Sequence, residues 1–406
     1  MRMLVVHKDY DGNKIAEFIG RGRRGTSPGG LQWAGYYKRL RTAGAFTLSF
    51  NANDTRVLDF EPYHHVEFWL RDEFGGSEYD AFLAGLPTYQ KNTFRPGWYR
   101  DFTGLVLTEP QLNQSSDGTF TSQILGRGLN QLLFNEYVDY APTTSEASKS
   151  GAAETVAKEF VDENIGPGAG ADAGGNTRVR AGVTVETDAG TGATWAGDRS
   201  RKLLADVLQE VADVGPGDYM IVQTGDAAFQ FQWRSPHWGL DKRLGNGVRR
   251  PALFSARVNN VEDVSSIVSY LNAITGAIVY GQGVGPGLKP GTAYDTTLTA
   301  ATSLARRVTL RQSSRQEVSQ TSLDNAAFSI LRDNRVEVNV DATVKEIVSS
   351  RYNVHWGIGD LTTIEDTIFG RQIDRKVVGV RVNMRSRSGS DPIVGVTPEF
   401  GDFIDA

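Results

Sequence analysis

Residues 336–345 read Val-Glu-Val-Asn-Val-Asp-Ala-Thr-Val-Lys, a strict alternation of apolar and polar side chains. Because successive side chains of a strand point to opposite faces, this period of two predicts a half-buried β-strand. Directly before it, residues 322–332 predict a helix with one apolar side, formed by Leu323, Ala326, Ala327, Ile330 and Leu331. The C-terminal part of the chain is therefore expected to be β-structure with one helix packed on it.

Strand and turn patterns also fill the N-terminal part of the chain, residues 1–140. Leu4-Val5-Val6 and Ile15-Ala16-Glu17-Phe18 flank Asp11-Gly12, a dipeptide that favours a two-residue hairpin turn. A second hairpin is predicted from residues 111–112 to residues 120–124 across Asp117-Gly118. Further strands are expected at residues 66–70 and 104–107. Several short strands separated by Gly, Asn and Asp indicate a β-barrel or a β-sandwich.

Between residues 141 and 250 the apolar pattern changes to a helical period. One helix is expected at residues 150–164, and another at residues 199–214 with Asp198 as its N-cap. Strands follow at residues 219–222 and 229–234. Helices followed by strands make this region an α+β element inserted between two β regions, at residues 1–140 and 251–406.

Residues 166–197 lie inside this element and are rich in Gly, Ala, Thr and Asp, with few large apolar side chains. Three alternatives stay open for this Gly-rich loop: an exposed loop, a weak hairpin, or an ordered insertion that docks on another subunit.

Composition bounds the class of protein. The 406 residues, 44.4 kDa in mass, are too many for one ordinary core. Hydrophobic residues at 39% and charged residues at 22% are typical of a globular chain. The 43 Lys and Arg against 48 Asp and Glu give a net charge of −5, which argues against a large cationic face for nucleic acid. The absence of cysteine excludes disulfides, thiol catalysis and thiolate metal sites.

Targeting signals are not expected either. The N-terminal sequence turns polar after Leu4-Val5-Val6, which is not the pattern of a signal peptide. No apolar run approaches the ~20 residues needed to cross a bilayer. The sequence therefore predicts a soluble protein without a membrane span, made and assembled in a cytoplasm.

The histidines do not form a recognisable site. They stand at His7, His64, His65, His237 and His355, and no His-Glu-x-x-His or His-x-His motif occurs. His64 and His65 are neighbours in a predicted strand, so their side chains should point to opposite faces and cannot easily share a metal. Single packed or surface histidines are the favoured interpretation.

Other catalytic patterns are absent or weak. The nucleophile motif Gly-x-Ser-x-Gly and the phosphate loop Gly-x-x-x-x-Gly-Lys-Ser/Thr do not occur. Gly281–Gly287 follows a predicted strand, but Pro286 and Pro290 remove the helix that would hold a pyrophosphate. Paired acids such as Asp72-Glu73 and Glu365-Asp366 arise by chance among 48 carboxylates. The sequence predicts no enzyme, and no catalytic, cofactor-binding or metal-binding residue.

Two basic segments remain. Residues 20–25 read Gly-Arg-Gly-Arg-Arg-Gly, which suits phosphate or an acidic partner, although a solvated loop or a subunit contact is favoured on an acidic protein. Arg371, Arg375 and Lys376 are interpreted as protection of a strand edge.

The order of these segments resembles the baseplate hub family of long-tailed bacteriophages, the tail hub proteins of siphophage-type tail tips. The helix at residues 322–331, the alternating strand after it, and residues 354–364 with the Gly359-Asp360 turn are similar to the family's closing part. The basic strand at residues 374–380 follows in the same order. Residues 201–209 leading to residues 219–222 resemble the family's inserted domain, and residues 102–106 resemble its strand after the first loop.

The resemblance implies a mainly β chain with an α+β insertion. Residues 1–140 would form a first tail-tube-like β-barrel, residues 141–250 the inserted domain, and residues 251–406 a second such barrel. The family implies a structural virion protein: a homotrimer whose six barrels match a six-fold tail tube to a three-fold tip. It also implies a channel through which DNA passes during ejection, without sequence-specific binding.

The same resemblance implies partners and location. Distal tail and tail tube proteins would bind above the hub, tip or fibre proteins below it, and the tape-measure protein is a further partner. The protein would be part of the virion tail tip after assembly in the host cytoplasm.

A second function class stays open, namely a carbohydrate-binding receptor-binding tip protein or a polysaccharide-degrading enzyme. Tryptophans could supply stacking platforms for sugar rings, although packing is their commoner role. They stand at Trp33, Trp69, Trp98, Trp195, Trp233, Trp238 and Trp356.

Overall fold

The computed structural model of the protein describes residues 1–19, 30–51, 53–114, 120–139, 146–172, 174–199, 201–247, 250–281, 287–312, 319–367, 370–385 and 393–401. The arginine segment at residues 20–25, the turn at Asp117-Gly118 and most of the Gly281–Gly287 loop lie outside these ranges.

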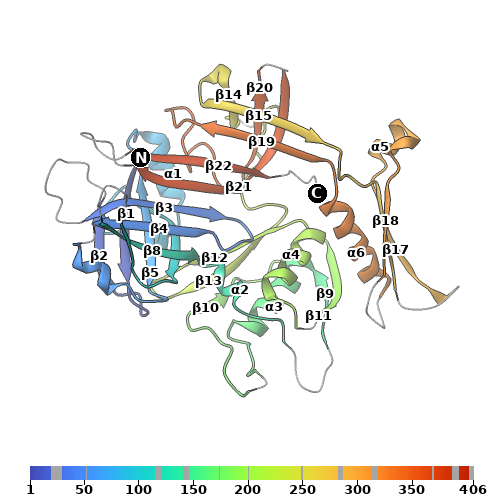
Figure 1. Ribbon diagram of the computed structural model, residues 1–406, viewed down its shortest axis with the longest axis horizontal. Helices are drawn as coiled ribbons and strands as arrows, with labels where there is room; N and C mark the ends of the chain where they lie inside the picture. Colours follow the sequence, from blue (N-terminus) through green and yellow to red (C-terminus); the bar gives the residue numbers. More distant parts are fainter. Residues whose placement is uncertain are drawn as a thin grey trace.

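Helices and strands follow one another in three regions (Figure 1). The first region contains β1 (Arg2–Lys8), β2 (Lys14–Ile19), β3 (Leu31–Arg39), β4 (Ala45–Asn51), η1 (Thr55–Asp59), β5 (His65–Arg71), α1 (Ser77–Gly85), η2 (Thr88–Gln90), β6 (Tyr99–Val106), β7 (Gln111–Gln114), β8 (Phe120–Gly128) and α2 (Gln131–Phe134). The middle region contains β9 (Ala147–Ala152), α3 (Ala153–Asn164), β10 (Val183–Val185), β11 (Thr194–Arg199), α4 (Leu204–Val214), β12 (Asp218–Gln223) and β13 (Phe229–Arg234). The last region contains β14 (Leu253–Ser255), η3 (Ala256–Val258), β15 (Val261–Ser269), β16 (Gly276–Tyr280), β17 (Pro290–Tyr294), α5 (Thr297–Ala301), η5 (Ser303–Ala305), β18 (Val308–Gln312), α6 (Gln320–Asp333), β19 (Glu337–Val344), β20 (Leu361–Asp366), β21 (Arg371–Arg385) and β22 (Ile393–Gly401).

Strands from both ends of the chain form one large sheet. Its order is β14-β20-β21-β3-β4-β8-β6-β5-β1-β2, with β22 beside β21 and β7 beside β8. The two ends join in the antiparallel pair β21–β3, where Val382 lies opposite Tyr36. The strand pairing of both predicted hairpins is confirmed, because β1 pairs with β2 and β7 pairs with β8. The first turn is longer than the predicted two residues, since Lys8 lies opposite Lys14. The chain is mainly β, as predicted, and its first and last β regions share this main sheet.

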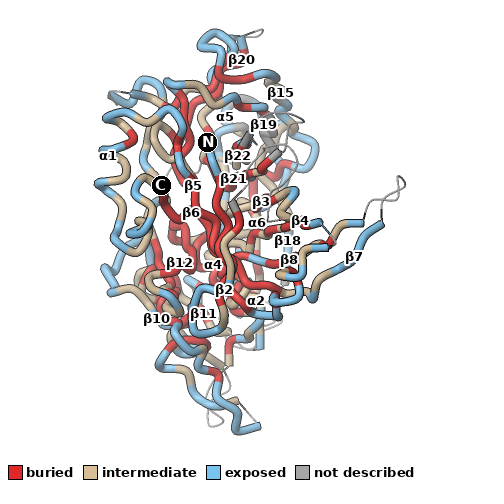
Figure 2. Tube along the Cα trace, turned by 90° about the vertical axis from the view of Figure 1, so that its left-hand side faces the viewer, coloured by how far each residue is buried: buried red, intermediate tan, exposed pale blue. Residues whose placement is uncertain are grey.

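Aromatic side chains fill the core under the main sheet. Tyr36 stacks on Phe102 with 4.9 Å between ring centroids, and Phe68 lies 5.7 Å from the Phe102 ring. Phe46 packs over a glycine of β8, where a Cβ added at Gly126 would come within 2.2 Å of the ring. Glycine is therefore needed at this position, because any Cβ would collide with the Phe46 ring. Buried residues run through the central strands of the sheet (Figure 2).

The inserted α+β unit has a core of its own. Helix α3 packs on the sheet β10-β13-β12 and on α4, around a core that includes Phe160 and Trp233. The helix predicted at residues 150–164 is confirmed as α3. The second helix begins later than predicted, at Leu204. Residues 194–199 pair with β9 and hold Trp195 against Phe160, so Asp198 lies in a strand and does not cap a helix.

The Gly-rich loop at residues 166–197 contains two strands that pair with different neighbours. β10 runs parallel to β13, and β11 runs antiparallel to β9, so the two strands do not pair with each other. A single antiparallel bridge between Ala171 and Thr177 is the part of the segment that resembles the predicted weak hairpin. Between the two strands the Glu154 carboxylate accepts hydrogen bonds from the backbone N–H of Ala189 and of Thr191. This part of the segment is therefore tied to α3, and docking on another subunit stays a prediction.

Residues 261–344 form a lobe whose outer part, from β16 to α6, lies at one end of the molecule, while the β15–β19 ribbon runs back over the main sheet (Figure 1). It consists of the ribbon β15-β19, the sheet β17-β16-β18 and helix α6, which is the helix predicted at residues 322–332. The α6 side chains of Leu323, Ala327 and Leu331 pack with Ala277 and Val279 of β16. The other side of α6 contacts β11 and α4, so the helix lies between the lobe sheet and the inserted unit.

Candidate assembly interface

Buried ion pairs join the three parts of the chain. Asp218, at the start of β12, accepts hydrogen bonds from Lys376 Nζ at 2.9 Å, Arg41 Nε at 3.1 Å and the backbone N–H of Trp238 at 2.9 Å. Burial alone would raise the pKa of Asp218, but the charges of Lys376 and Arg41 outweigh it and hold this pKa below its usual value. The Asp218 cluster thus ties the inserted unit to β21 and to the β3–β4 turn.

The same cluster reaches the lobe through a second carboxylate. Asp213, in α4, forms an ion pair with Arg41 at 3.2 Å and another with Arg332 of α6. Since Arg41 contacts both Asp213 and Asp218, one guanidinium links two carboxylates of the inserted unit. The relative positions of main sheet, inserted unit and lobe are therefore set by charge-assisted hydrogen bonds.

Lys376 and Arg375 do not protect a strand edge as predicted. They lie in β21, which has β20, β22 and β3 as neighbours. Arg375 is buried and the Lys376 side chain is 13% exposed, and the Lys376 ammonium forms an ion pair with Asp218. The strand can carry Lys376 inside the sheet because Asp218 is its counter-ion. The sequence pattern does not reveal this partner, since it lies far away along the chain.

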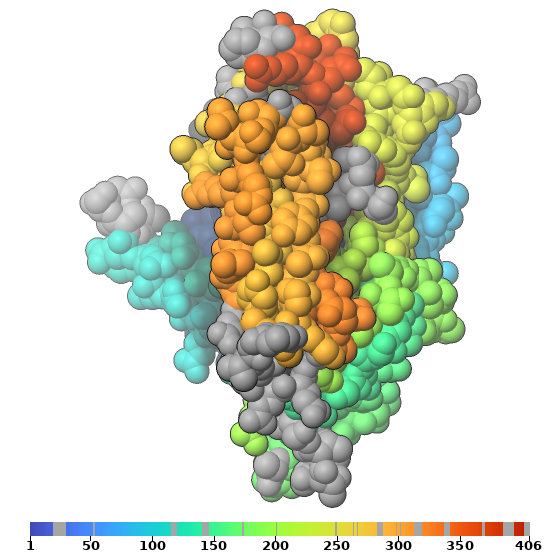
Figure 3. Space-filling view, turned by 90° about the vertical axis from the view of Figure 1, so that its right-hand side faces the viewer, coloured from blue at the N-terminus to red at the C-terminus, as the bar shows by residue number. Residues whose placement is uncertain are grey.

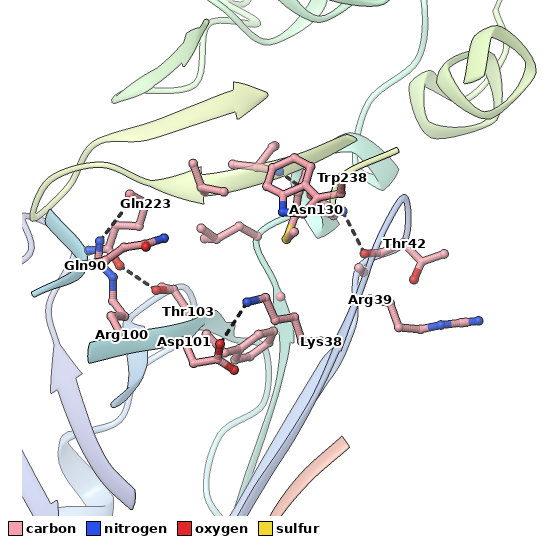
Figure 4. A pocket seen from close by; sticks show the side chains of 17 residues that line it. Lys38, Arg39, Thr42, Gln90, Arg100, Asp101, Thr103, Asn130, Gln223 and Trp238 are labelled. Atoms are coloured by element: carbon pink, nitrogen blue, oxygen red, sulfur yellow. Dashed lines mark hydrogen bonds and ion pairs between the residues drawn. The ribbon is translucent and has the colours of Figure 1, made fainter. Parts of the chain in front are cut away.

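A small polar cavity lies where the inserted unit meets β6 and β3 (Figure 4). Its volume is about 110 Å³. Gln223, at the end of β12, accepts a hydrogen bond from Thr103 Oγ1 at 2.7 Å and donates one to Glu67 at 2.8 Å. Arg100 donates to the Gln223 carbonyl at 2.7 Å and pairs with Glu67 at 3.1 Å. The polar groups of these side chains are hydrogen-bonded to one another. The cavity is therefore part of the contact between the inserted unit and the first β region.

The opposite wall of the cavity belongs to a second buried network. The Asp101 carboxylate accepts hydrogen bonds from Lys38 at 3.1 Å, Tyr36 at 2.6 Å and Tyr352 at 3.1 Å. Burial, together with the charge of Asp101, raises the pKa of Tyr36 and of Tyr352 well above the usual tyrosine value. Both hydroxyls therefore stay protonated as donors, and they hold the segment before β20 against the first β region.

The histidines occupy separate structural positions, with one exception. His7 Nε2 and His64 Nδ1 lie 3.0 Å apart and are buried, and the His7 ring stacks on Phe60 at 3.8 Å. His65 packs edge-on against Phe229, and His355 contacts Glu78. In the part of the chain that the structure describes, no three His, Cys, Asp or Glu side chains gather as metal ligands would. The His7–His64 pair was missed because strands distant in sequence bring it together.

The paired acids found in the sequence have structural partners. Asp72 forms a buried ion pair with Arg351, and Glu73 pairs with Arg2 near the N-terminus. Glu365 accepts a hydrogen bond from the Ser255 hydroxyl. The sequence does not indicate these partners, because each lies far away along the chain.

None of the seven tryptophans presents an exposed ring. Five are buried and two, Trp33 and Trp238, are half-buried. Platforms for sugar stacking need an open ring face, so this arrangement does not favour a carbohydrate site built on tryptophan.

Among the described residues, some exposed apolar side chains lie on the lobe and on one projecting hairpin, and others are spread over the rest of the surface. On the lobe they come from the β15–β19 ribbon, the outer sheet, the connecting loops and α6: Ile267, Val268, Tyr270, Leu271, Tyr294, Leu304, Leu310 and Phe328. On the hairpin, which is the β7–β8 arm, they are Leu112 and Phe120. Large exposed apolar areas mark surfaces that contact another protein.

None of the described helices is long and apolar enough to cross a membrane.

The fold is similar to that of tail proteins of known structure. No protein-family model matches the sequence, and no curated protein matches it. The tail protein from Neisseria meningitidis MC58 has a similar structure, with a TM-score of 0.54, 12% identity, and coverage of 99% of this chain and 97% of that chain. The prophage MuSo2 43 kDa tail protein from Shewanella oneidensis has a TM-score of 0.52, 14% identity, and 98% of each chain covered. The predicted resemblance to phage tail proteins is confirmed at the level of the fold.

Glu346 offers a first testable prediction about stability. Burial raises its pKa to about 7. An acid whose pKa is raised on folding stabilises the fold when protonated, and this stabilisation is lost as the pH rises through 7. Glu346→Gln is therefore expected to raise the free energy of unfolding at pH 8.5 by about 1–2 kcal/mol and to change it little at pH 5. Urea unfolding at the two pH values measures this.

The control for this prediction is Glu262→Gln, which removes an exposed carboxylate paired with Lys345 at 3.4 Å. It should change stability by less than about 0.5 kcal/mol at both pH values. An equal effect of Glu346→Gln at pH 5 and pH 8.5 would contradict the role of protonation.

Proposed function

We propose that this protein is a non-enzymatic structural component of the virion, a trimeric hub at the tip of a phage tail. The observation that carries the proposal is the fold shared with two phage tail proteins along 99% and 98% of this chain. The exposed apolar surfaces of the lobe and the β7–β8 arm support it, because an assembly subunit needs surfaces that its neighbours cover. The buried ionic joint supports it as well, since it holds these surfaces in fixed positions.

We infer that each subunit supplies two tail-tube-like barrels, one from residues 1–140 and one from residues 251–406, with residues 141–250 inserted between them. Three subunits then present six barrels to a six-fold tail tube and a three-fold face to the tip. The β21–β3 pairing supports this arrangement, because it makes the two β regions one rigid scaffold. A three-fold ring can match a six-fold tube only if each subunit presents two similar barrels at fixed positions.

The proposed partners follow from this position. Distal tail and tail tube proteins bind above the ring, tip or fibre proteins bind below it, and the tape-measure protein contacts it from the channel. The ring forms in the host cytoplasm and lines the path of the DNA. A net charge of −5 agrees with a wall that lets phosphates pass without sequence-specific binding.

The oligomeric state tests the proposal. Light scattering of the purified protein over a concentration series is expected to give a mass of three times 44.4 kDa, about 133 kDa. A mass of 44.4 kDa at every concentration would argue against a self-assembling hub and would favour a monomeric binding protein.

A further inference from the structure

The lobe sheet has one covered face and one open face. A Cβ added at Gly291 of β17 would meet Leu323 of α6, so that side of the sheet is covered by the helix. A Cβ added at Gly276 of β16 would instead meet Tyr294 at 2.7 Å and Val308 at 3.2 Å. Tyr294 and Val308 therefore lie on the face that points away from α6. Figure 3 shows this side of the molecule, with the lobe in orange.

The open face is apolar. Ile278 lies opposite Leu310 in the parallel pair β16–β18, two residues beyond Gly276 and Val308 on the same face. Leu310 is 62% exposed and Tyr294 is 51% exposed. Together Ile278, Tyr294, Val308 and Leu310 form the lobe face. The lobe's own cluster of buried apolar side chains has six members, so this face is not needed to complete it.

The β7–β8 arm carries a matching apolar strip. Leu112 lies opposite Ser122, and Gln114 lies opposite Phe120. Since residues two apart share a face, Leu112 and Phe120 lie on the same side of the hairpin. They are 65% and 45% exposed. The arm projects from the body of the molecule in Figures 2 and 3, away from the lobe face of its own chain.

Charge favours contact between the arm and the lobe face. From residue 108 to residue 123 the sequence has two acidic residues and no Lys or Arg. From residue 287 to residue 312 it has four basic residues and one acidic residue. Of these, Lys289 and Arg306 are exposed just before β17 and β18, whereas Arg311 lies opposite Val279 and so on the face that α6 covers. The occupant best matched to the lobe face is therefore apolar and slightly acidic, as the arm is.

We propose that the β7–β8 arm of one subunit docks on the lobe face of the next copy of the same chain. Leu112 and Phe120 contact Leu310 and Tyr294, with the exposed Lys289 and Arg306 near the ends of the same strands. Arm and lobe face are two different surfaces on different sides of one molecule, so the contact is heterologous and repeats around a ring. This inference rests on the proposed ring-forming function and names the surfaces that make the ring.

Cysteine cross-linking tests the contact, because the chain has no cysteine of its own. The double variant Leu112→Cys/Leu310→Cys, oxidised mildly after purification, is expected to give disulfide-linked dimers and trimers on non-reducing gels. The bands should collapse to a single 44.4 kDa band on reduction. The matched control is Leu58→Cys/Leu310→Cys, since Leu58 is 76% exposed but lies in η1, outside the arm. The control and each single variant should stay uncross-linked.

Light scattering of the reduced proteins separates failure of the contact from failure of the ring. A trimeric species that cross-links through residues 112 and 310 supports the proposal. A trimeric species that does not cross-link, or that cross-links equally through residue 58, overturns the arm–lobe contact and leaves the trimer intact. A monomer at every concentration overturns both.

A second variant tests the role of the lobe face in trimer formation without introducing cysteine. At a concentration where the wild type is trimeric, Leu310→Asp is expected to lower the trimer fraction at least tenfold, and Leu58→Asp is expected to leave it unchanged. A trimer fraction unaffected by Leu310→Asp would overturn the proposed contact.

Discussion

Asp218→Ala is expected to lower the free energy of unfolding by about 3–5 kcal/mol, because it leaves Lys376 without its carboxylate and Arg41 with Asp213 alone. Lys376 and Arg41 both bind Asp218, and the Asp218 side chain is 1% exposed. The cluster lies between the inserted unit and the main sheet, so its loss should also weaken their coupling. Urea unfolding, followed by circular dichroism and by tryptophan fluorescence, is expected to show an earlier midpoint and two separated transitions.

The matched control is Asp226→Ala. Asp226 also binds a lysine, Lys8, at 2.7 Å, but its side chain is 78% exposed. Its loss should cost less than about 1 kcal/mol. A double variant, Asp218→Leu/Lys376→Met, removes both charges and should recover part of the stability lost in Asp218→Ala. Equal costs for Asp218→Ala and Asp226→Ala would show that the buried cluster does not hold the units together.

Local patterns predicted the secondary structure because each depends on side chains a few residues apart. The alternation from residue 336 identified β19, and the Asp11-Gly12 turn identified the β1–β2 hairpin. The apolar stripe at residues 322–332 identified α6. The start of α4 was misplaced because Arg199 pairs with β9 and Leu203 forms an antiparallel bridge with Tyr137, and such long-range pairing cannot be read locally.

Contacts between distant segments could not be predicted in the same way. Nothing in the sequence around residue 36 indicates that β3 pairs with β21, which lies near the other end of the chain. The same holds for Asp218, which looks like any strand-end aspartate until Lys376 and Arg41 are placed beside it. The interface candidates share this property, since an exposed leucine such as Leu310 and a buried one follow the same alternating pattern.

The mistaken interpretation of Lys376 has a general physical reason. A cation in a strand is commonly a device that blocks edge-to-edge pairing. Inside a sheet it must instead have a counter-ion, because burial without one lowers its pKa and costs stability. In this protein burial does lower the pKa of Lys376, and Asp218 opposes that shift. A cation in a strand therefore indicates either that the strand lies at the edge of a sheet or that the cation has a buried counter-ion. The order of the strands in the sheet is needed to choose between these two cases.

A second large effect is expected from the buried His7–His64 pair, namely a loss of stability at acid pH. The hydrogen bonds of the pair determine the tautomer of each ring. His64 Nδ1 accepts the backbone N–H of Glu61 at 3.3 Å, so it carries no proton, and His7 Nε2 must donate to it. His7 Nδ1 is then an unprotonated, buried nitrogen, and no described group donates to it. Burial, and to a smaller extent the neighbouring His64, lowers the pKa of His7 to about 3.

His7→Phe is therefore expected to make the protein less sensitive to acid. A base whose pKa falls on folding stabilises the fold above its unfolded pKa of 6.5, and this stabilisation is lost as the pH falls from 6.5 toward 3. Between pH 7 and pH 4 the wild type should lose about 3 kcal/mol more than the variant, whose phenyl ring can keep the stack on Phe60. His355, with a pKa lowered to about 4 by burial, stays in both proteins, so the difference between their pH curves isolates His7. Parallel curves from urea unfolding across this range would show that His7 does not take up a proton on acid unfolding.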